Sequence, residues 1–183
     1  MDNETDLALV ERCRNGDWSA FTELVIRYQR PIYNAAFWML HKAEDASDVT
    51  QTVFLRVAER LDDYDAHYKF FSWIYRIAVN ESLNLLRRNG HEEALDEEVE
   101  LPGPPGANPE QSVGDAELAR RIQGALSRMN AADRMILSLR HFSECSYQEI
   151  GEILDLDEKT VKSRLFEARH RLRQMLKDLR TPL

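Results

Sequence analysis

The sequence predicts an all-α protein with two small helical domains joined by a flexible acidic linker, and three observations support this prediction. Apolar residues on both sides of the chain's middle recur with the period of a helix, with little of the alternation typical of strands. Residues 91–113 contain four prolines and seven acidic side chains but no lysine or arginine. The last third of the chain carries the pattern of two helices joined by a tight turn.

Apolar spacing and capping residues predict the individual helices. Asn15 and Gly16 form a stop signal after the first helix, and Asp17 can cap the second. Pro31 predicts a kink or a break in that second helix. We expect helices over residues 6–14, from 17 onward, over 44–61 and 71–88, and then over 115–129, 132–141, 147–154 and 158–179.

The middle of the chain is predicted to be a linker. Residues 91–113 are too polar and too rich in proline to bury a core that offsets the entropy of ordering them. We therefore expect one domain over residues 1–90 and another over residues 114–183.

The composition and the first residues predict a cytoplasmic protein. Of the 183 residues, 43% are hydrophobic and 31% are charged, as in ordinary soluble proteins. The first residues are acidic and polar, so we expect no secretory signal. No apolar run approaches the roughly 20 residues that span a bilayer, so we expect no membrane insertion. Cys13 and Cys145 lie far apart and are expected to stay reduced.

The formal net charge of −8 argues at first against binding to nucleic acid. The net negative charge comes largely from residues 91–113, however, whereas residues 158–183 contain eight basic and three acidic side chains. Local patches govern contacts with phosphate more than the total charge does. The basic C-terminal end is therefore compatible with a role in binding nucleic acid.

The segment from Ser146 onward predicts a helix-turn-helix. Ser146 and Glu149 have the spacing of a capping box, and a turn over residues 155–157 separates the two helices. The second helix has an apolar side at Val161, Leu165, Ala168 and Leu172. Its opposite side is expected to contact duplex DNA through Lys159, Lys162, Ser163, Phe166, His170 and Arg173. The alternative is a helical hairpin with a solvated charged face.

The helix predicted over 71–88 carries a polar stripe that could contact DNA. The stripe consists of Arg76, Asn80, Asn84 and Arg87. It offers cations to phosphates and amides to base edges. The loop before it is rich in aromatic residues, and we expect Tyr64, Tyr68 and Phe70 to stack on unpaired bases. An ordinary surface face is the alternative.

The helix predicted over 44–61 has a buried side and a side suited to a protein partner. Val49, Val53, Val57 and Leu61 form the buried side. Asp48, Gln51, Thr52 and Leu55 share the opposite arc. A leucine exposed among polar residues suggests an interface, although a single exposed leucine is also common on ordinary surfaces.

Taken in order, these segments resemble the sigma-70 family of bacterial RNA polymerase sigma factors, and within it the extracytoplasmic-function (ECF) group. The resemblance to region 2.2 is carried by EDASDVTQTVFLRVAERL, that to regions 2.3 and 2.4 by KFFSWIYRIAVNESLNLLRR, and that to region 4 by MILSLRHFSECSYQEIGEILDLDEKTVKSRLFEARHRLRQML. The resemblance implies that the first domain is sigma region 2, a helical bundle, and that the second is sigma region 4.

Three positions depart from the usual family pattern. Asp155 stands where glycine is common, and we expect it to adopt a left-handed backbone, which aspartate tolerates better than most residues. Gly151 stands where alanine is frequent, at a small expected cost in helix stability. Glu167 stands where many relatives carry a basic residue, which leaves the −35 sequence preference open.

The resemblance also implies partners. The arc that contains Leu55 would contact the β′ clamp helices of core RNA polymerase, and region 4 would meet the β flap. The loop over residues 62–71 and Asn80 would capture a flipped base of the −10 element, and the helix over 158–173 would contact the −35 element. The linker would thread through the polymerase. The resemblance further implies an anti-sigma factor as a partner.

Other classes of protein fit the sequence less well. A dimeric helix-turn-helix regulator acting without polymerase would have a ligand pocket or a dimer seam in its first domain. A helical adaptor that binds only protein would not need the basic helix. The sequence lacks P-loop, GxSxG and HExxH motifs, so we expect no catalysis and no cofactor. His141 and Cys145 could share a helix face, but a metal site needs further ligands.

Overall fold

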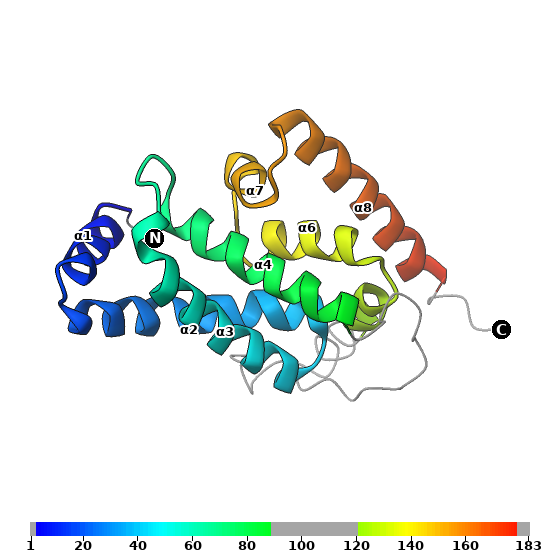
Figure 1. The fold of residues 1–183 in the computed structure, drawn as a ribbon. Coiled ribbons are helices and arrows are strands. Elements are labelled where there is room, and N and C mark those ends of the chain that lie inside the picture. The colour runs from blue at the N-terminus through cyan, green and yellow to red at the C-terminus, as the bar shows by residue number, and fades with distance from the viewer. Residues whose placement is uncertain (1–2, 89–120, 179–183) are drawn as a thin grey trace, which may run out of the picture.

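The computed structural model describes residues 3–88 and 121–178, in which the regular elements are helices (Figure 1). The N-terminal unit comprises α1 (Asn3–Arg14), α2 (Trp18–Leu40), α3 (Ala43–Arg60), a 3₁₀ turn (Leu61–Asp63) and α4 (Phe70–Arg88). The C-terminal unit comprises a helical segment over 121–127, α6 (Ala131–His141), α7 (Tyr147–Leu154) and α8 (Glu158–Asp178). The all-α prediction is confirmed. The predicted linker over 91–113 and residues 115–120 of a predicted helix lie outside the described residues.

The turn between α1 and α2 forms as its residues predict. Gly16 has a φ of +88°, a left-handed conformation that suits glycine. Asp17 then caps α2, since its carboxylate accepts a hydrogen bond from the Ser19 backbone N–H at 3.0 Å. The short turn brings α2 back against α1.

The helix α2 continues through Pro31, so of the two predicted alternatives, a kink or a break, the break is wrong. Proline removes one backbone hydrogen bond inside a helix. The residues beyond it form the most buried part of α2, with Ile32 and Phe37 both inaccessible to solvent or nearly so. Burial of these large side chains favours a continuous helix.

A buried acidic residue ties α1 to α2. The Asp6 side chain is 1% exposed and forms an ion pair with Arg27 and a hydrogen bond with the Tyr28 hydroxyl. A buried carboxylate needs such partners because burial removes its hydration. This contact therefore holds α1 against α2.

The apolar side of α3 packs as the sequence predicts. Val49, Val53, Val57 and Leu61 are buried. This side of α3 packs against α2 and α4. The opposite side of α3 and one side of α4 are left to solvent.

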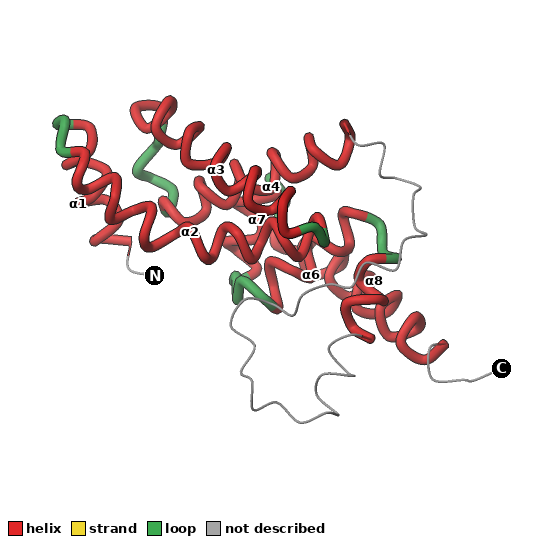
Figure 2. Tube along the Cα trace, turned by 90° about the horizontal axis from the view of Figure 1, so that it is seen from below, coloured by secondary structure: helices red, strands yellow, loops and turns green. Residues whose placement is uncertain are grey.

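The C-terminal unit packs directly on the N-terminal unit, with α6 against α2 and α7 against α4 (Figures 1 and 2). The aromatic rings of Trp38 and Phe142 stack across this contact with their centroids 3.7 Å apart and an interplanar angle of 8°. Figure 1 shows α8 along the outer side of the molecule. The described residues therefore share one continuous hydrophobic core.

Candidate DNA and polymerase interfaces

The helix-turn-helix forms with the predicted local geometry. Ser146 and Glu149 make both hydrogen bonds of the capping box, at 3.1 and 2.8 Å. Asp155 has a φ of +55°, the left-handed conformation expected of it. The Asp157 carboxylate accepts a hydrogen bond from the Thr160 backbone N–H at 2.8 Å and so caps α8. These residues set the direction in which α8 leaves the turn.

Gly151 has a structural role in the turn, beyond the small cost in helix stability that was predicted for it. A Cβ atom at this position would lie 2.6 Å from the Leu156 carbonyl oxygen, which is part of the turn backbone. That separation is well below ordinary van der Waals contact. The glycine therefore lets the turn lie close to α7, and the expectation of a simple cost in helix stability is corrected.

The predicted DNA-contacting face of α8 is exposed along its whole length. Its apolar side is anchored by Val161, Leu165 and Ala168, which are buried, while Leu172 is partly buried. The exposed face consists of Lys159, Lys162, Ser163, Phe166, His170 and Arg173. Phe166 is 72% exposed, so its ring is accessible to a partner. The arrangement presents cations around an apolar ring.

One predicted cation on α8 is already engaged. The Lys162 ammonium lies 2.6 Å from the Glu158 carboxylate, one helical turn away, and 5.6 Å from the centre of the Tyr147 ring. The hydrogen bond to Glu158 raises the pKa of Lys162. Exposed pairs of this kind contribute little stability, so a phosphate can replace Glu158 at small cost.

The polar stripe of α4 is exposed as predicted. Arg76, Asn80, Asn84 and Arg87 are all accessible to solvent. The opposite side of the helix is buried, with Ile74, Tyr75 and Ala78 in the core. The stripe therefore forms an outer edge of the N-terminal unit.

A groove beside Asn80 is lined by two arginines that were not among the residues predicted to bind DNA. The groove has a volume of about 280 Å³ and is lined by Arg56, Arg60, Ile77, Asn80 and Glu81. Arg56 also lies 3.6 Å from the Glu81 carboxylate, which links α3 to α4. Arg56 and Arg60 are one helical turn apart, but only the packing of α3 on α4 places them next to Asn80.

The aromatic loop before α4 differs from the prediction. Tyr64 is 3% exposed and Phe70 is 0% exposed, and their rings pack edge to face with centroids 5.4 Å apart. The Tyr64 hydroxyl donates a hydrogen bond to the Tyr68 carbonyl at 2.6 Å. Burial raises the pKa of Tyr64 to about 12. The assignment of Tyr64 and Phe70 to base stacking is therefore corrected, because both rings hold the loop on the core.

Tyr68 is the aromatic residue of this loop that remains accessible, with 56% of its surface exposed. Asp65 and His67 accompany it at the tip, where the His67 ring lies 2.7 Å from the Asp65 carboxylate. Contact with His67 lowers the pKa of Asp65. The loop thus presents one aromatic ring and a small polar cluster.

The polar arc of α3 lies on the surface away from the core. Asp48, Gln51 and Leu55 are exposed and Thr52 is half-buried. Leu55 is 64% exposed, whereas the valines on the other side of the helix are buried. The arc is therefore available to a partner.

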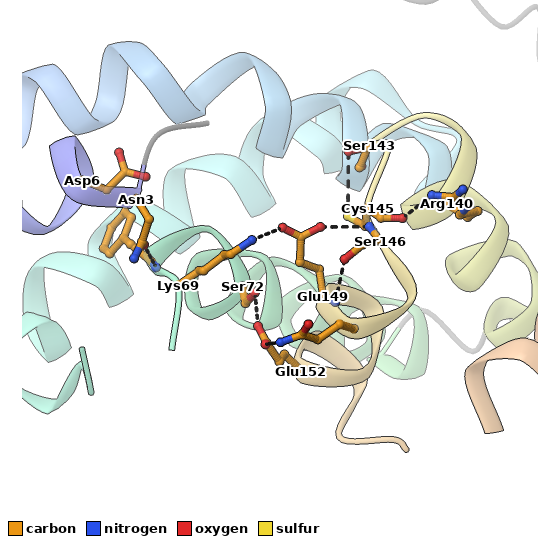
Figure 3. Close-up of polar contacts among 12 residues, drawn as sticks. Asn3, Asp6, Lys69, Ser72, Arg140, Ser143, Cys145, Ser146, Glu149 and Glu152 are labelled. Carbon is orange, nitrogen blue, oxygen red and sulfur yellow. Dashed lines mark hydrogen bonds and ion pairs between the residues drawn. The ribbon is translucent and has the colours of Figure 1, made fainter. Parts of the chain in front are cut away.

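Polar side chains connect α4 with α7 (Figure 3). The Lys69 ammonium lies 2.8 Å from a Glu149 carboxylate oxygen, and the Ser72 hydroxyl donates to Glu152 at 2.6 Å. Burial opposes ionisation of Glu149, but hydrogen bonds from Lys69 and Ser146 lower its pKa overall. A groove of about 450 Å³ lies beside this contact, between α2 and residues 142–145.

His141 and Cys145 do not gather further ligands. The His141 ring accepts a hydrogen bond from Arg169 at 3.3 Å, and Cys145 is buried, which raises the pKa of its thiol to about 12. In residues 3–88 and 121–178 there is no cluster of three or more histidine, cysteine or acidic side chains that could hold a metal. Within the same ranges, no helix combines the length and the apolar character that crossing a bilayer requires.

His41 makes the fold sensitive to acid. It ends α2, is buried, and neither ring nitrogen has a hydrogen-bond partner in the part of the chain that the structure describes. Burial, and then the charge of Arg134 on α6, lower its pKa from 6.5 to about 4. The folded state therefore favours neutral His41, and its contribution to stability is present above pH 6.5 and is lost as the pH falls toward 4.

We expect the free energy of unfolding to fall by at most about 1.4 kcal/mol per pH unit between pH 6.5 and 4 through His41 alone. Urea denaturation at a series of pH values measures this slope. Replacing His41 with Asn, which cannot titrate and accepts a left-handed backbone, should reduce the slope in that window. Equal slopes for the parent and His41→Asn would contradict the assignment.

Comparison with known proteins agrees with this geometry. The chain matches the family models for Sigma-70 region 2 over residues 24–92 and for Sigma-70 region 4 over residues 119–172. It is 33% identical to the ECF RNA polymerase sigma factor SigW of Bacillus subtilis over 181 residues, which cover 93% of this chain and 96% of SigW.

Two solved structures are similar in fold. CnrH in complex with the cytosolic domain of CnrY aligns with a TM-score of 0.73 and 25% identity, over 97% of this chain and 99% of CnrH. The sigma factor RpoE in complex with the anti-sigma factor NepR, from Bartonella quintana, aligns with a TM-score of 0.68 and 22% identity, over 86% and 96% of the two chains.

Two helical units that match Sigma-70 region 2 and region 4, the second of which contains a helix-turn-helix, identify a DNA-binding protein of transcription initiation. With the matches above, the chain belongs to the sigma-70 family, as an ECF RNA polymerase sigma factor. The family prediction made from the sequence is confirmed.

Proposed function

We propose that this sigma factor binds core RNA polymerase through α3, contacts the −10 element through α4 and contacts the −35 element through α8. The observation that carries the proposal is the exposed stripe of α4, in which Asn80 adjoins a groove lined by Arg56 and Arg60. A surface of amides and cations suits DNA whose bases are unpaired, because the amides match base edges and the cations match phosphates. A regulator of duplex DNA needs no such surface.

The −10 contact would combine edge recognition with stacking. The Asn80 amide carries both donors and an acceptor and can match the Watson–Crick edge of an extruded base. Tyr68, exposed in the preceding loop, is the ring available for stacking. Arg56, Arg60 and Arg87 would contact the backbone of the melted strand.

The polymerase contact would use the surface around Leu55. This arc lies on the side of α3 that faces away from the core, so a partner can reach it without disturbing the fold. The β′ clamp helices of core polymerase are its proposed partner, and the C-terminal unit would meet the β flap. The protein would act in the cytoplasm, as a binding subunit without catalysis of its own.

An anti-sigma factor is a further proposed partner. The solved relative RpoE was captured with the anti-sigma factor NepR. The groove between α2 and residues 142–145 is the proposed docking position for a segment of such a protein, because both units contribute to its walls.

A run-off transcription assay with purified core polymerase on a promoter library tests the proposed function. We expect the added chain to produce transcripts from templates that share two short sequence blocks upstream of the start. Transcription that is no more selective than that of core polymerase alone would contradict the proposal.

The proposed −35 contact can be tested at Lys162. Replacing Lys162 with Ala should weaken binding to a promoter duplex and lower the slope of log affinity against log salt by about one unit, if Lys162 contacts a phosphate. Lys42→Ala is the control, because Lys42 is exposed at the start of α3, in the other unit. Titrations at several salt concentrations measure both quantities, and equal slopes for the parent and Lys162→Ala would refute the phosphate contact.

A further inference from the structure

The helix α1 holds the beginning of the loop that connects α3 with α4. Arg14 lies in the last turn of α1. Its guanidinium donates hydrogen bonds to the backbone carbonyl oxygens of Leu61, Asp62 and Tyr64, at 2.8, 3.3 and 2.7 Å. These acceptors lie where α3 ends and the loop over residues 62–69 begins, and Figure 1 shows that loop beside α1. One side chain of α1 therefore fixes the first part of the loop.

The acceptors of Arg14 suit a guanidinium. The last carbonyl groups of a helix lack partners within the helix and carry its partial negative charge. A guanidinium has five N–H donors in a planar arrangement and can satisfy several oxygens at once. The Asp62 carboxylate lies farther away, at 3.9 Å, and is exposed to solvent. The hydrogen bonds to the backbone are therefore the main contact of Arg14 with the loop.

Tyr64 connects this contact with the tip of the loop. Its carbonyl oxygen accepts from Arg14, and its hydroxyl donates a hydrogen bond to the Tyr68 carbonyl at 2.6 Å. The Tyr64 ring between these two groups is buried. The Tyr68 backbone N–H also donates to the Asp65 carbonyl at 3.1 Å. The backbone at Tyr68 is thus linked to Arg14 through one buried side chain.

The same helix holds the other end of the loop. The Asn3 side-chain oxygen accepts a hydrogen bond from the Phe70 backbone N–H at 3.3 Å, at the first residue of α4. The first N–H groups of a helix have no partner within the helix, so Asn3 caps α4 from outside. Asn3 and Arg14 are the first and last residues of α1. The two ends of the loop are therefore attached to the two ends of one helix.

Between these attachments the loop is open to solvent. Residues 65–69 are exposed, and 56% of the Tyr68 surface is accessible. An exposed loop loses backbone and side-chain entropy when it becomes ordered on a ligand. Attachment at both ends restricts the loop before the ligand arrives, and such preorganisation lowers the entropy that binding must still remove.

We propose that Arg14 is a positioning residue for promoter opening, which acts through Tyr64 to hold the loop in the conformation that presents Tyr68 to an extruded base. The inference rests on the proposed role of Tyr68 at the −10 element. Arg14 does not itself contact DNA in this arrangement. The helix α1 precedes residues 24–92, which match the Sigma-70 region 2 model, so the inference assigns a role in opening to a part of the chain outside that match.

Arg14→Ala tests the attachment, and Arg12→Ala is the matched control. Arg12 lies in the same turn of α1 but pairs with Asp17 and Glu23, at the beginning of α2. Both variants remove one arginine from this turn, and only the first removes a contact with the loop. Hydrogen–deuterium exchange of the full chain, followed by mass spectrometry, measures the loop directly. We expect faster exchange in residues 62–69 for Arg14→Ala and parent exchange there for Arg12→Ala.

Promoter opening is the second measurement, made with core polymerase on a promoter that the parent selects from the run-off library. We expect Arg14→Ala to reduce permanganate reactivity of unpaired thymines roughly tenfold, the size expected from losing charge-assisted hydrogen bonds. Affinity for the same promoter at low temperature, where its strands stay paired, should remain at the parent level. General loss of structure would lower both quantities, so this difference separates positioning from unfolding. Circular dichroism checks that the helices persist.

Asn3→Ala protects the test if Arg14→Ala fails to fold. It releases the other end of the loop while the contacts of Arg14 remain, and it should reduce opening in the same direction. Parent exchange in residues 62–69 of both variants would overturn the attachment. Faster exchange with parent opening, or equal losses of opening in Arg14→Ala and Arg12→Ala, would overturn the positioning role. Failure of the proposed function looks different, since the parent itself would then show no selective transcription in the run-off assay.

Discussion

Leu55→Asp is expected to weaken binding to core RNA polymerase by about 2 kcal/mol, or roughly thirtyfold, which is typical for loss of a central apolar contact at an interface. Leu55 is 64% exposed on the outer side of α3, so the charge should not disturb the core. Affinity for labelled core polymerase, measured by fluorescence anisotropy, gives the change. Unfolding by urea should occur at the same midpoint as in the parent.

Ile26→Asp is the matched control for that experiment. Ile26 is 66% exposed on α2, so the two substitutions exchange equally exposed aliphatic residues for the same charge. We expect Ile26→Asp to retain nearly the parent affinity. Equal losses for both variants would show that Leu55 has no special place in the polymerase contact.

Asn80→Ala is expected to reduce the fraction of open promoter complexes roughly tenfold, because edge contacts to one base contribute about 1–3 kcal/mol. Asn80 is exposed beside Arg56 and Arg60 and is not part of the contact with α7. Core binding and −35 contact should therefore stay close to the parent values. Permanganate reactivity of unpaired thymines, together with abortive initiation, measures the loss.

Gln29→Ala is the control for promoter opening. Gln29 is an exposed amide on α2, and its removal tests whether loss of any surface amide has the same effect. We expect open complexes at the parent level. If Asn80→Ala melts the promoter as well as Gln29→Ala does, Asn80 does not bind the extruded base.

Local sequence signals predicted the local structure well. The capping box at Ser146, the stop at Gly16 and the left-handed Asp155 all formed as expected. Each of these depends on hydrogen bonds or backbone preferences within a few residues, so the sequence alone contains the necessary information. The same holds for the faces of α3, α4 and α8, since helical period assigns each residue to one side.

In the aromatic loop, residue type alone does not predict which rings are exposed. Tyr64, Tyr68 and Phe70 have similar side chains, and a stacking role fits each of them in sequence. Burial separates them, because Tyr64 and Phe70 pack on the core while Tyr68 lies outside. Loop side chains follow no fixed period, so their direction depends on the helices around them.

The sequence by itself determined the helices, their buried and exposed faces and the family of this protein, because these follow from residue spacing and short motifs. Only the tertiary structure decided that Arg56 and Arg60 adjoin Asn80, and that α7 contacts Lys69, Ser72 and Arg76. Such contacts join residues as much as 80 positions apart. Their formation depends on how whole helices pack, which the pattern of any single helix does not specify.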